Sequence, residues 1–181
     1  MSIFSGVIAA LAGKGFRAQM DTGRTGFMPA LIALGLTVPL YLFCAYGAAQ
    51  NSGVEPGISA PVLTVILTMT VFTAPMVIYL ISYLISAPER FRPWMIVRSW
   101  AVFGLAIIMA LGFALFLGGL APFKLAYAIA LVGYIASLLV DIRLAQTAAQ
   151  MNPVAAVLIG CAIAIASLLV MLAGFASVAG Y

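Results

Sequence analysis

Five long apolar runs, separated by short polar loops, constrain this chain more than any other feature. A water-soluble fold cannot bury a sequence of 181 residues that is 66% hydrophobic and 7% charged, with a mean hydropathy of +1.25. Each run has about the 20 residues that a membrane-spanning helix needs. We therefore expect an all-α integral membrane protein, a bundle of five transmembrane helices preceded by a short interfacial helix. The expected spans are 27–48, 61–85, 100–119, 122–140 and 154–178, within a membrane domain of residues 26–181.

The N-terminal segment, residues 1–25, predicts a short helix that lies in the membrane interface. Its apolar run of about ten residues is too short to cross a bilayer. Lys14 and Arg17 follow the run, and we expect them to reach the lipid head groups. A docking surface for another subunit and a disordered start are the alternatives. The bulky side chains that share one helical face are Ile3, Phe4, Val7, Ile8 and Leu11.

The positive charges predict how the chain crosses the membrane. Lysine and arginine gather on the cytoplasmic side of membrane proteins, and Lys124 alone falls on the other side of the expected five-span path. We therefore expect a cytoplasmic N-terminus, an outer C-terminus and, from the alanine- and glycine-rich composition, a bacterial cytoplasmic (inner) membrane. The net charge of +4 fits anionic lipids at the cytoplasmic face rather than nucleic acid. The cations on the shared side are Lys14, Arg17, Arg24, Arg90, Arg92, Arg98 and Arg143.

The loop expected between the second and third spans holds the densest group of charges in the chain. Arginines interleaved with aromatic residues suit phospholipid head groups or an acidic partner. The alternative is a topology anchor with ordinary interfacial aromatic residues. The residues of this predicted head-group or partner patch are Arg90, Arg92, Trp94 and Arg98.

Small residues recur every four positions in two of the expected spans. This spacing lets a second helix approach closely, because small side chains share one face. We expect these faces to pack against other helices, including those of other membrane subunits or of a second copy. They are Ala106, Ala110, Ala114 and Gly118 in one span, and Ala156, Gly160 and Ala164 in the other.

Two prolines fall in the interior of expected spans. Pro39 and Pro75 each remove a backbone donor and are expected to act as hinges. Four threonines precede Pro75 in the same span. They either line a polar path or bond the carbonyls of their own helix. The threonines are Thr64, Thr68, Thr70 and Thr73.

The interiors of the expected spans carry no ionisable residue, although such residues usually mark chemistry inside a membrane. The chain has no histidine, and Cys44 and Cys161 are expected to be free thiols that pack as small apolar groups. Asp141 beside Arg143 predicts an interfacial pair at a helix end, with a substrate head-group site as the alternative. We expect no catalytic, cofactor-binding or metal site, and we expect that the protein is not an enzyme.

The run from Leu131 to Leu139, LVGYIASLL, precedes the final apolar span. Together with five closely spaced spans and short loops, it resembles the layout of the Yip1-like membrane family over roughly Thr25 to Val178. The Asp-Leu-Tyr-Gly-Pro motif and the long polar N-terminal region of the eukaryotic members are missing. The resemblance implies a non-enzymatic membrane organiser and transfers no site residues.

Two functional hypotheses follow. The leading one is a non-catalytic membrane protein that acts by helix packing, as a scaffold, accessory subunit or membrane organiser. The alternative is a transporter or channel for a neutral or weakly polar solute, with the Thr64 and Thr68 face as its path. A lipid-modifying enzyme comes third, since the four carboxylates are scattered along the chain.

Overall fold

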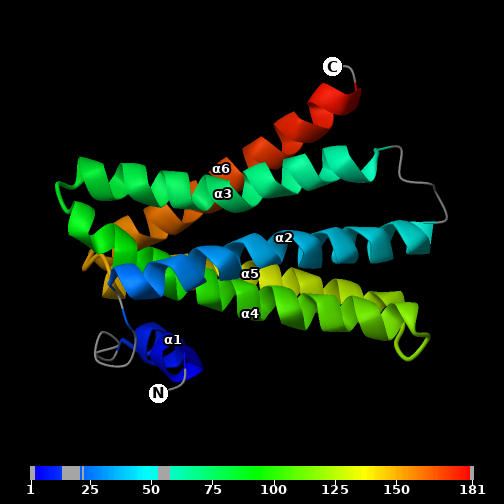
Figure 1. The fold of residues 1–181 in the computed structure, drawn as a ribbon, viewed down its shortest axis with the longest axis horizontal. Coiled ribbons are helices and arrows are strands. Elements are labelled where there is room, and N and C mark those ends of the chain that lie inside the picture. The colour runs from blue at the N-terminus through cyan, green and yellow to red at the C-terminus, as the bar shows by residue number, and fades with distance from the viewer. Residues whose placement is uncertain (1–2, 14–20, 22, 53–57, 180–181) are drawn as a thin grey trace.

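The computed structural model describes residues 3–13, 21, 23–52 and 58–179, and every regular element among them is helical (Figure 1). Five of the helices are long and apolar enough to cross a membrane. The expected all-α membrane fold, with a short N-terminal helix before five spans, is therefore confirmed. In chain order the elements are α1 (Ile3–Leu11), α2 (Arg24–Ser52), α3 (Ala60–Leu84), the 3-10 turn η2 (Pro88–Arg90), α4 (Phe91–Leu117), α5 (Phe123–Thr147) and α6 (Pro153–Ala179).

α4 and α5 extend furthest beyond the bounds that the hydropathy pattern predicts. α4 begins at Phe91 rather than at residue 100, and α5 ends at Thr147 rather than near residue 140. Pro93 falls in the first turn of α4, where its missing N–H needs no partner within the helix. Arg98 and Asp141 therefore lie inside helices rather than in loops.

The five spanning helices pack as a closed ring. α2 packs against α4 and α3, α5 packs against α4 and α6, and α3 packs against α6. The order around the ring is therefore α2, α4, α5, α6, α3. α1 lies outside the ring, against α4 and α5 (Figure 1). We call the end where α4 begins and α5 ends the basic end, because Arg92, Arg98 and Arg143 lie toward it; Lys124 lies near the opposite end.

Turn residues place the helix ends largely where the sequence predicts them. Gly119 adopts a φ of 71° in the tight turn that joins α4 to α5 as an antiparallel hairpin. Asn152 accepts a hydrogen bond of 2.8 Å from the backbone N–H of Ala155, so it caps α6 just before Pro153 as expected. Before α2, the carboxylate of Asp21 accepts hydrogen bonds from the Gly23 N–H and the Thr25 hydroxyl.

α1 packs through only part of the predicted face, since Val7 is buried and Leu11 packs against the core but Ile8 does not. Val7, Ala9 and Ala10 are buried, whereas the Ile8 side chain is 67% exposed. The two alanines let the helix backbone approach α4 and α5 closely, which outweighs burial of the bulkier residue. The predicted head-group contacts of Lys14 and Arg17 fall outside the described residues.

The packed core is centred on the first turns of α4, at the basic end. Trp94, Ile96 and Val97 are fully buried there, together with Leu34 of α2 and Leu144 of α5. A second, smaller cluster lies toward the opposite end and contains Cys44, Ala110, Phe113 and Ala126. The residues that the sequence assigns to a polar surface loop thus form the start of a buried helix.

The prolines leave their helices continuous. Pro39 lies within α2 and Pro75 within α3, and neither helix is divided at them. All four threonines of α3 donate their hydroxyl to the carbonyl four residues earlier, at 2.7 to 2.9 Å. This is the self-bonding alternative, so Thr64 and Thr68 do not offer a free hydroxyl path. The hinge role of the prolines stays a prediction.

Candidate functional site

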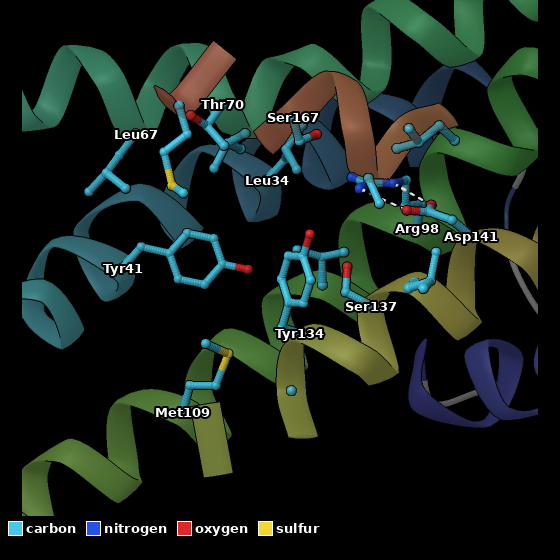
Figure 2. A pocket seen from close by; sticks show the side chains of 17 residues that line it. Leu34, Tyr41, Leu67, Thr70, Arg98, Met109, Tyr134, Ser137, Asp141 and Ser167 are labelled. Atoms are coloured by element: carbon cyan, nitrogen blue, oxygen red, sulfur yellow. Dashed lines mark hydrogen bonds and ion pairs between the residues drawn. The ribbon is translucent and has the colours of Figure 1, made fainter. Parts of the chain in front are cut away.

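A cavity of about 250 Å³ lies inside the ring, and every one of the five spanning helices contributes to its wall (Figure 2). Its lining is mostly apolar, with a charged pair at one end and hydroxyl groups along its length. The labelled side chains in Figure 2 approach it from α2, α3, α4, α5 and α6. They are Leu34, Tyr41, Leu67, Thr70, Arg98, Met109, Tyr134, Ser137, Asp141 and Ser167.

Arg98 of α4 and Asp141 of α5 form a buried ion pair at the wall of this cavity. Nε of Arg98 donates to Oδ1 of Asp141 over 2.6 Å, and Nη2 donates to Oδ2 over 3.2 Å. Only 6% of Arg98 and 3% of Asp141 is exposed. The two parallel hydrogen bonds are the strongest arrangement open to this pair of side chains.

This pairing replaces the one predicted from the sequence. Asp141 pairs with Arg98, whereas Arg143 donates to the Leu11 carbonyl over 3.2 Å and to Oε1 of Gln146 over 2.9 Å. The predicted pair is wrong because residues two apart on a helix point in different directions. The expectation of span interiors without ionisable groups is wrong as well, because it rested on spans that stop at residues 100 and 140.

Helices centred in a bilayer would place the ion pair in the shallow part of the membrane core. The 27 residues of α4 extend about 40 Å, against a hydrocarbon core of about 30 Å, so a centred helix projects about 5 Å at each end. Arg98 lies about 10 Å from the start of α4, and Asp141 about 9 Å from the end of α5. Both groups are thus about 5 Å inside the hydrocarbon, where an unpaired charge is costly.

Four hydroxyl groups along the cavity have no hydrogen-bond partner among the described residues. Figure 2 shows the rings of Tyr41 and Tyr134 approaching one another from α2 and α5. Ser137 of α5 and Ser167 of α6 add two smaller hydroxyls to the same wall. Thr70 also lines the cavity, but its hydroxyl is bonded to its own helix. Tyr134 is 52% exposed, and Tyr41, Ser137 and Ser167 are half-buried. Because no group of the described residues occupies these four hydroxyls, they are available to a molecule in the cavity.

The arrangement suits binding better than acid–base chemistry. Both carboxylate oxygens of Asp141 accept from Arg98, and among the described residues no second catalytic group is hydrogen-bonded to them. Within the described ranges, no three His, Cys, Asp or Glu side chains gather as metal ligands. The expectations of no cofactor and no enzymatic activity stay predictions.

The predicted head-group or partner patch is divided between surface and core. Arg92 is exposed. Arg90 donates a hydrogen bond to the Ala149 carbonyl, and its Nε lies 3.8 Å from Oε1 of Glu89. Trp94 is fully buried and Arg98 belongs to the ion pair, so neither is part of the surface.

The small-residue face of α4 is half buried and half exposed. Ala106 and Ala110 are buried inside the bundle, Ala110 in the cluster that contains Phe113. Ala114 and Gly118, nearer the end of the helix, are exposed. The exposed half is the part that remains free for another helix.

The small-residue face of α6 is used inside the chain. Ala156 and Gly160 are buried, and Ala164 lines the cavity. A Cβ atom at Gly160 would lie 2.4 Å from Cγ1 of Ile142, so α5 and α6 approach too closely for a larger residue. Packing of these two faces against a separate subunit stays a prediction.

The sequence contains one signal for the cavity, which the absence of charged residues from the expected spans does not reveal. Tyr134, Ser137 and Asp141 are spaced three and four residues apart, so they share one helical face of α5. A polar stripe of this kind on an otherwise apolar helix predicts a face turned away from lipid. Which helix faces that stripe depends on tertiary packing, so the local sequence does not predict it.

The ring of helices, the buried ion pair and the four hydroxyls are the features from which a function is inferred. The polar groups lie on the inside of the bundle, and the surface of the spanning helices is largely apolar. No family model, curated protein or solved structure matches this chain, so the resemblance to the Yip1-like family rests on layout alone.

Proposed function

We propose that this chain is a membrane carrier for a small neutral solute that forms several hydrogen bonds. The observation that carries the proposal is the cavity walled by all five spans, with the unpartnered hydroxyls of Tyr41, Tyr134, Ser137 and Ser167. Apolar pockets with a few convergent polar groups are typical ligand sites.

The charge of the cavity favours a neutral solute. Arg98 and Asp141 neutralise one another through two hydrogen bonds, so the wall presents a fixed dipole rather than a net charge. An ion entering the cavity would lose its hydration without meeting an unpaired opposite charge. A neutral molecule loses much less and gains hydrogen bonds to the hydroxyls.

The size of the cavity favours a solute of few atoms. Its volume of about 250 Å³ is just below the usual range for ligand pockets, which starts at about 300 Å³. Core packing flanks the cavity toward both ends of the bundle. We propose that helix movement, with Pro39 and Pro75 as its hinges, lets the solute pass, which makes the protein a carrier rather than an open channel.

Solute flux into proteoliposomes tests the proposal. Purified protein is reconstituted, and entry of glycerol or urea is followed by stopped-flow light scattering. Ser167→Leu places an apolar side chain in the cavity and is expected to lower the flux to that of protein-free liposomes. Ala162→Leu is the matched control, because Ala162 is an exposed residue of the same helix. Equal flux through both variants would contradict the proposal.

A second candidate is the accessory subunit or membrane organiser that helix packing implies. The exposed Ala114 and Gly118 at the end of α4 favour it, since they leave a small-residue face open to another helix. The Yip1-like resemblance belongs with this candidate. Extraction in mild detergent followed by native mass spectrometry distinguishes it: a monomer without a co-purifying protein speaks against this candidate.

We propose that the protein lies in the bacterial inner membrane, with its N-terminus in the cytoplasm. Support comes from Arg90, Arg92, Arg98 and Arg143, which all lie toward the basic end, against Lys124 near the other end. An epitope tag at each terminus, probed with protease in intact spheroplasts, measures the orientation. Protection of both tags would contradict a five-span path.

A further inference from the structure

An apolar groove runs along the outside of the ring, on the seam between α4 and α5. Its wider part has a volume of about 690 Å³ and is walled by α1, α4 and α5. A narrower part of about 320 Å³ continues between α4 and α5 toward the opposite end of the bundle. Both parts are lined by Leu105, Ile108 and Ala136, so they form one continuous groove. We call it the α4–α5 groove; it is separate from the central cavity.

The groove is at least as long as the hydrocarbon part of one bilayer leaflet is thick. It extends along α5 from Arg143 to Ala128, which at 1.5 Å per residue is about 22 Å. Half of the hydrocarbon core is about 15 Å. A chain lying in the groove can therefore reach from the membrane surface to the middle of the bilayer or beyond.

The mouth of the groove, at the basic end, carries a cation that no carboxylate of the described residues neutralises. Arg143 lines the wider part and is exposed. Its Nε and Nη1 donate to the carbonyl of Leu11, the last residue of α1, and to the Gln146 side chain, which are both neutral acceptors. Both ion pairs among the described residues involve other arginines. The guanidinium thus keeps its full charge and is held in place at the groove.

We propose that the α4–α5 groove binds one anionic phospholipid, with an acyl chain along the seam and the phosphate at Arg143. Charge complementarity selects this occupant, because a guanidinium fixed beside a long apolar groove matches a molecule with an anionic head and an apolar tail. α1 forms one wall, so the bound lipid also holds this short helix against the bundle. The site goes beyond the proposed carrier function and does not depend on it.

Native mass spectrometry of the full chain in detergent, titrated with phosphatidylglycerol or phosphatidylcholine, tests the proposal. The first complex with phosphatidylglycerol is expected to be about fivefold tighter, which is the typical gain from one arginine near an anionic head group. Arg143→Gln is expected to remove this preference, and Arg143→Lys to retain most of it. Ala136→Leu, which obstructs the middle of the groove, is expected to weaken the binding of both lipids.

Two control variants separate the site from general surface effects. Lys124→Gln removes an exposed cation outside the groove, and Ala114→Leu enlarges an exposed residue of α4 outside the groove; both are expected to leave lipid binding unchanged. Far-UV circular dichroism melting verifies that every variant is folded. The proposal is overturned by equal binding of the two lipids to the wild type, by a Lys124→Gln loss equal to that of Arg143→Gln, or by displacement of phosphatidylglycerol by oleate.

Discussion

Removing one member of the Arg98–Asp141 pair is expected to destabilise the protein more than removing both. In Asp141→Leu, the guanidinium keeps its charge about 5 Å inside the hydrocarbon and loses its two hydrogen bonds of 2.6 and 3.2 Å. Breaking a buried pair in this way costs about 3 to 5 kcal/mol. Arg98→Met strands the carboxylate and is expected to have a cost in the same range.

The double variant, Arg98→Met with Asp141→Leu, distinguishes the loss of the ion pair from the cost of burying an unpaired charge. It leaves no charge in the wall, and replacing a buried pair by apolar side chains is often neutral. We expect it to lie within about 1 kcal/mol of the wild type, so the coupling free energy between the two positions is at least about 5 kcal/mol.

The free energy of unfolding is measured by titrating SDS into mixed micelles and following helicity by circular dichroism. Lys124→Met is the matched control, because it removes an exposed cation near the opposite end and is expected to change stability by less than about 0.5 kcal/mol. Additive effects of the two single substitutions would refute the reasoning, since they would show that the two charges do not stabilise each other.

Three further outcomes are expected. Gly160→Leu forces α5 and α6 apart and is expected to cost about 1 to 3 kcal/mol in the same titration, whereas Ala162→Leu on the exposed face of α6 costs less than about 0.5 kcal/mol. The double variant Thr64→Val, Thr68→Val is expected to leave solute flux unchanged, because both hydroxyls are bonded to their own helix; a loss of flux would restore them as the path. The pKa of Asp21 is lowered from 3.8 by hydrogen bonds from a side chain and from the backbone. The ionised carboxylate therefore stabilises the start of α2 at neutral pH, and this stabilisation is lost as the pH falls below about 3.8. Amide exchange in the first turn of α2 is expected to speed up over that pH range in the wild type and not in Asp21→Asn.

Features with local signals were predictable from the sequence. Apolar length gave the five spans, and the hairpin at Gly119 and the helix start after Asn152 follow from turn and capping chemistry. The burial of Arg98 was not predictable in this way. Its partner is 43 residues away, and a hydropathy window ends a span at the first charge whether or not that charge is neutralised in the fold.

The central cavity was only half visible in the sequence. The spacing of Tyr134, Ser137 and Asp141 predicts a polar face on α5, but the approach of Tyr41 and Ser167 depends on which helices are neighbours in the ring. The threonines of α3 follow one of the two alternatives that the sequence left open, because they donate to the carbonyls of their own helix. Composition shows a polar residue, whereas only the structure shows that its hydroxyl is already bonded.

The placement of the ion pair on two consecutive helices bears on how the chain is made. Arg98 leaves the ribosome well before Asp141, and an unpaired arginine opposes insertion of a lone helix, by up to about 2.5 to 3.5 kcal/mol at the helix centre on the translocon scale. With only the short Gly118–Pro122 link between them, α4 and α5 form a hairpin in which each charge arrives with its counter-ion. We therefore expect the insertion machinery to release these two helices into lipid together, as one biosynthetic unit.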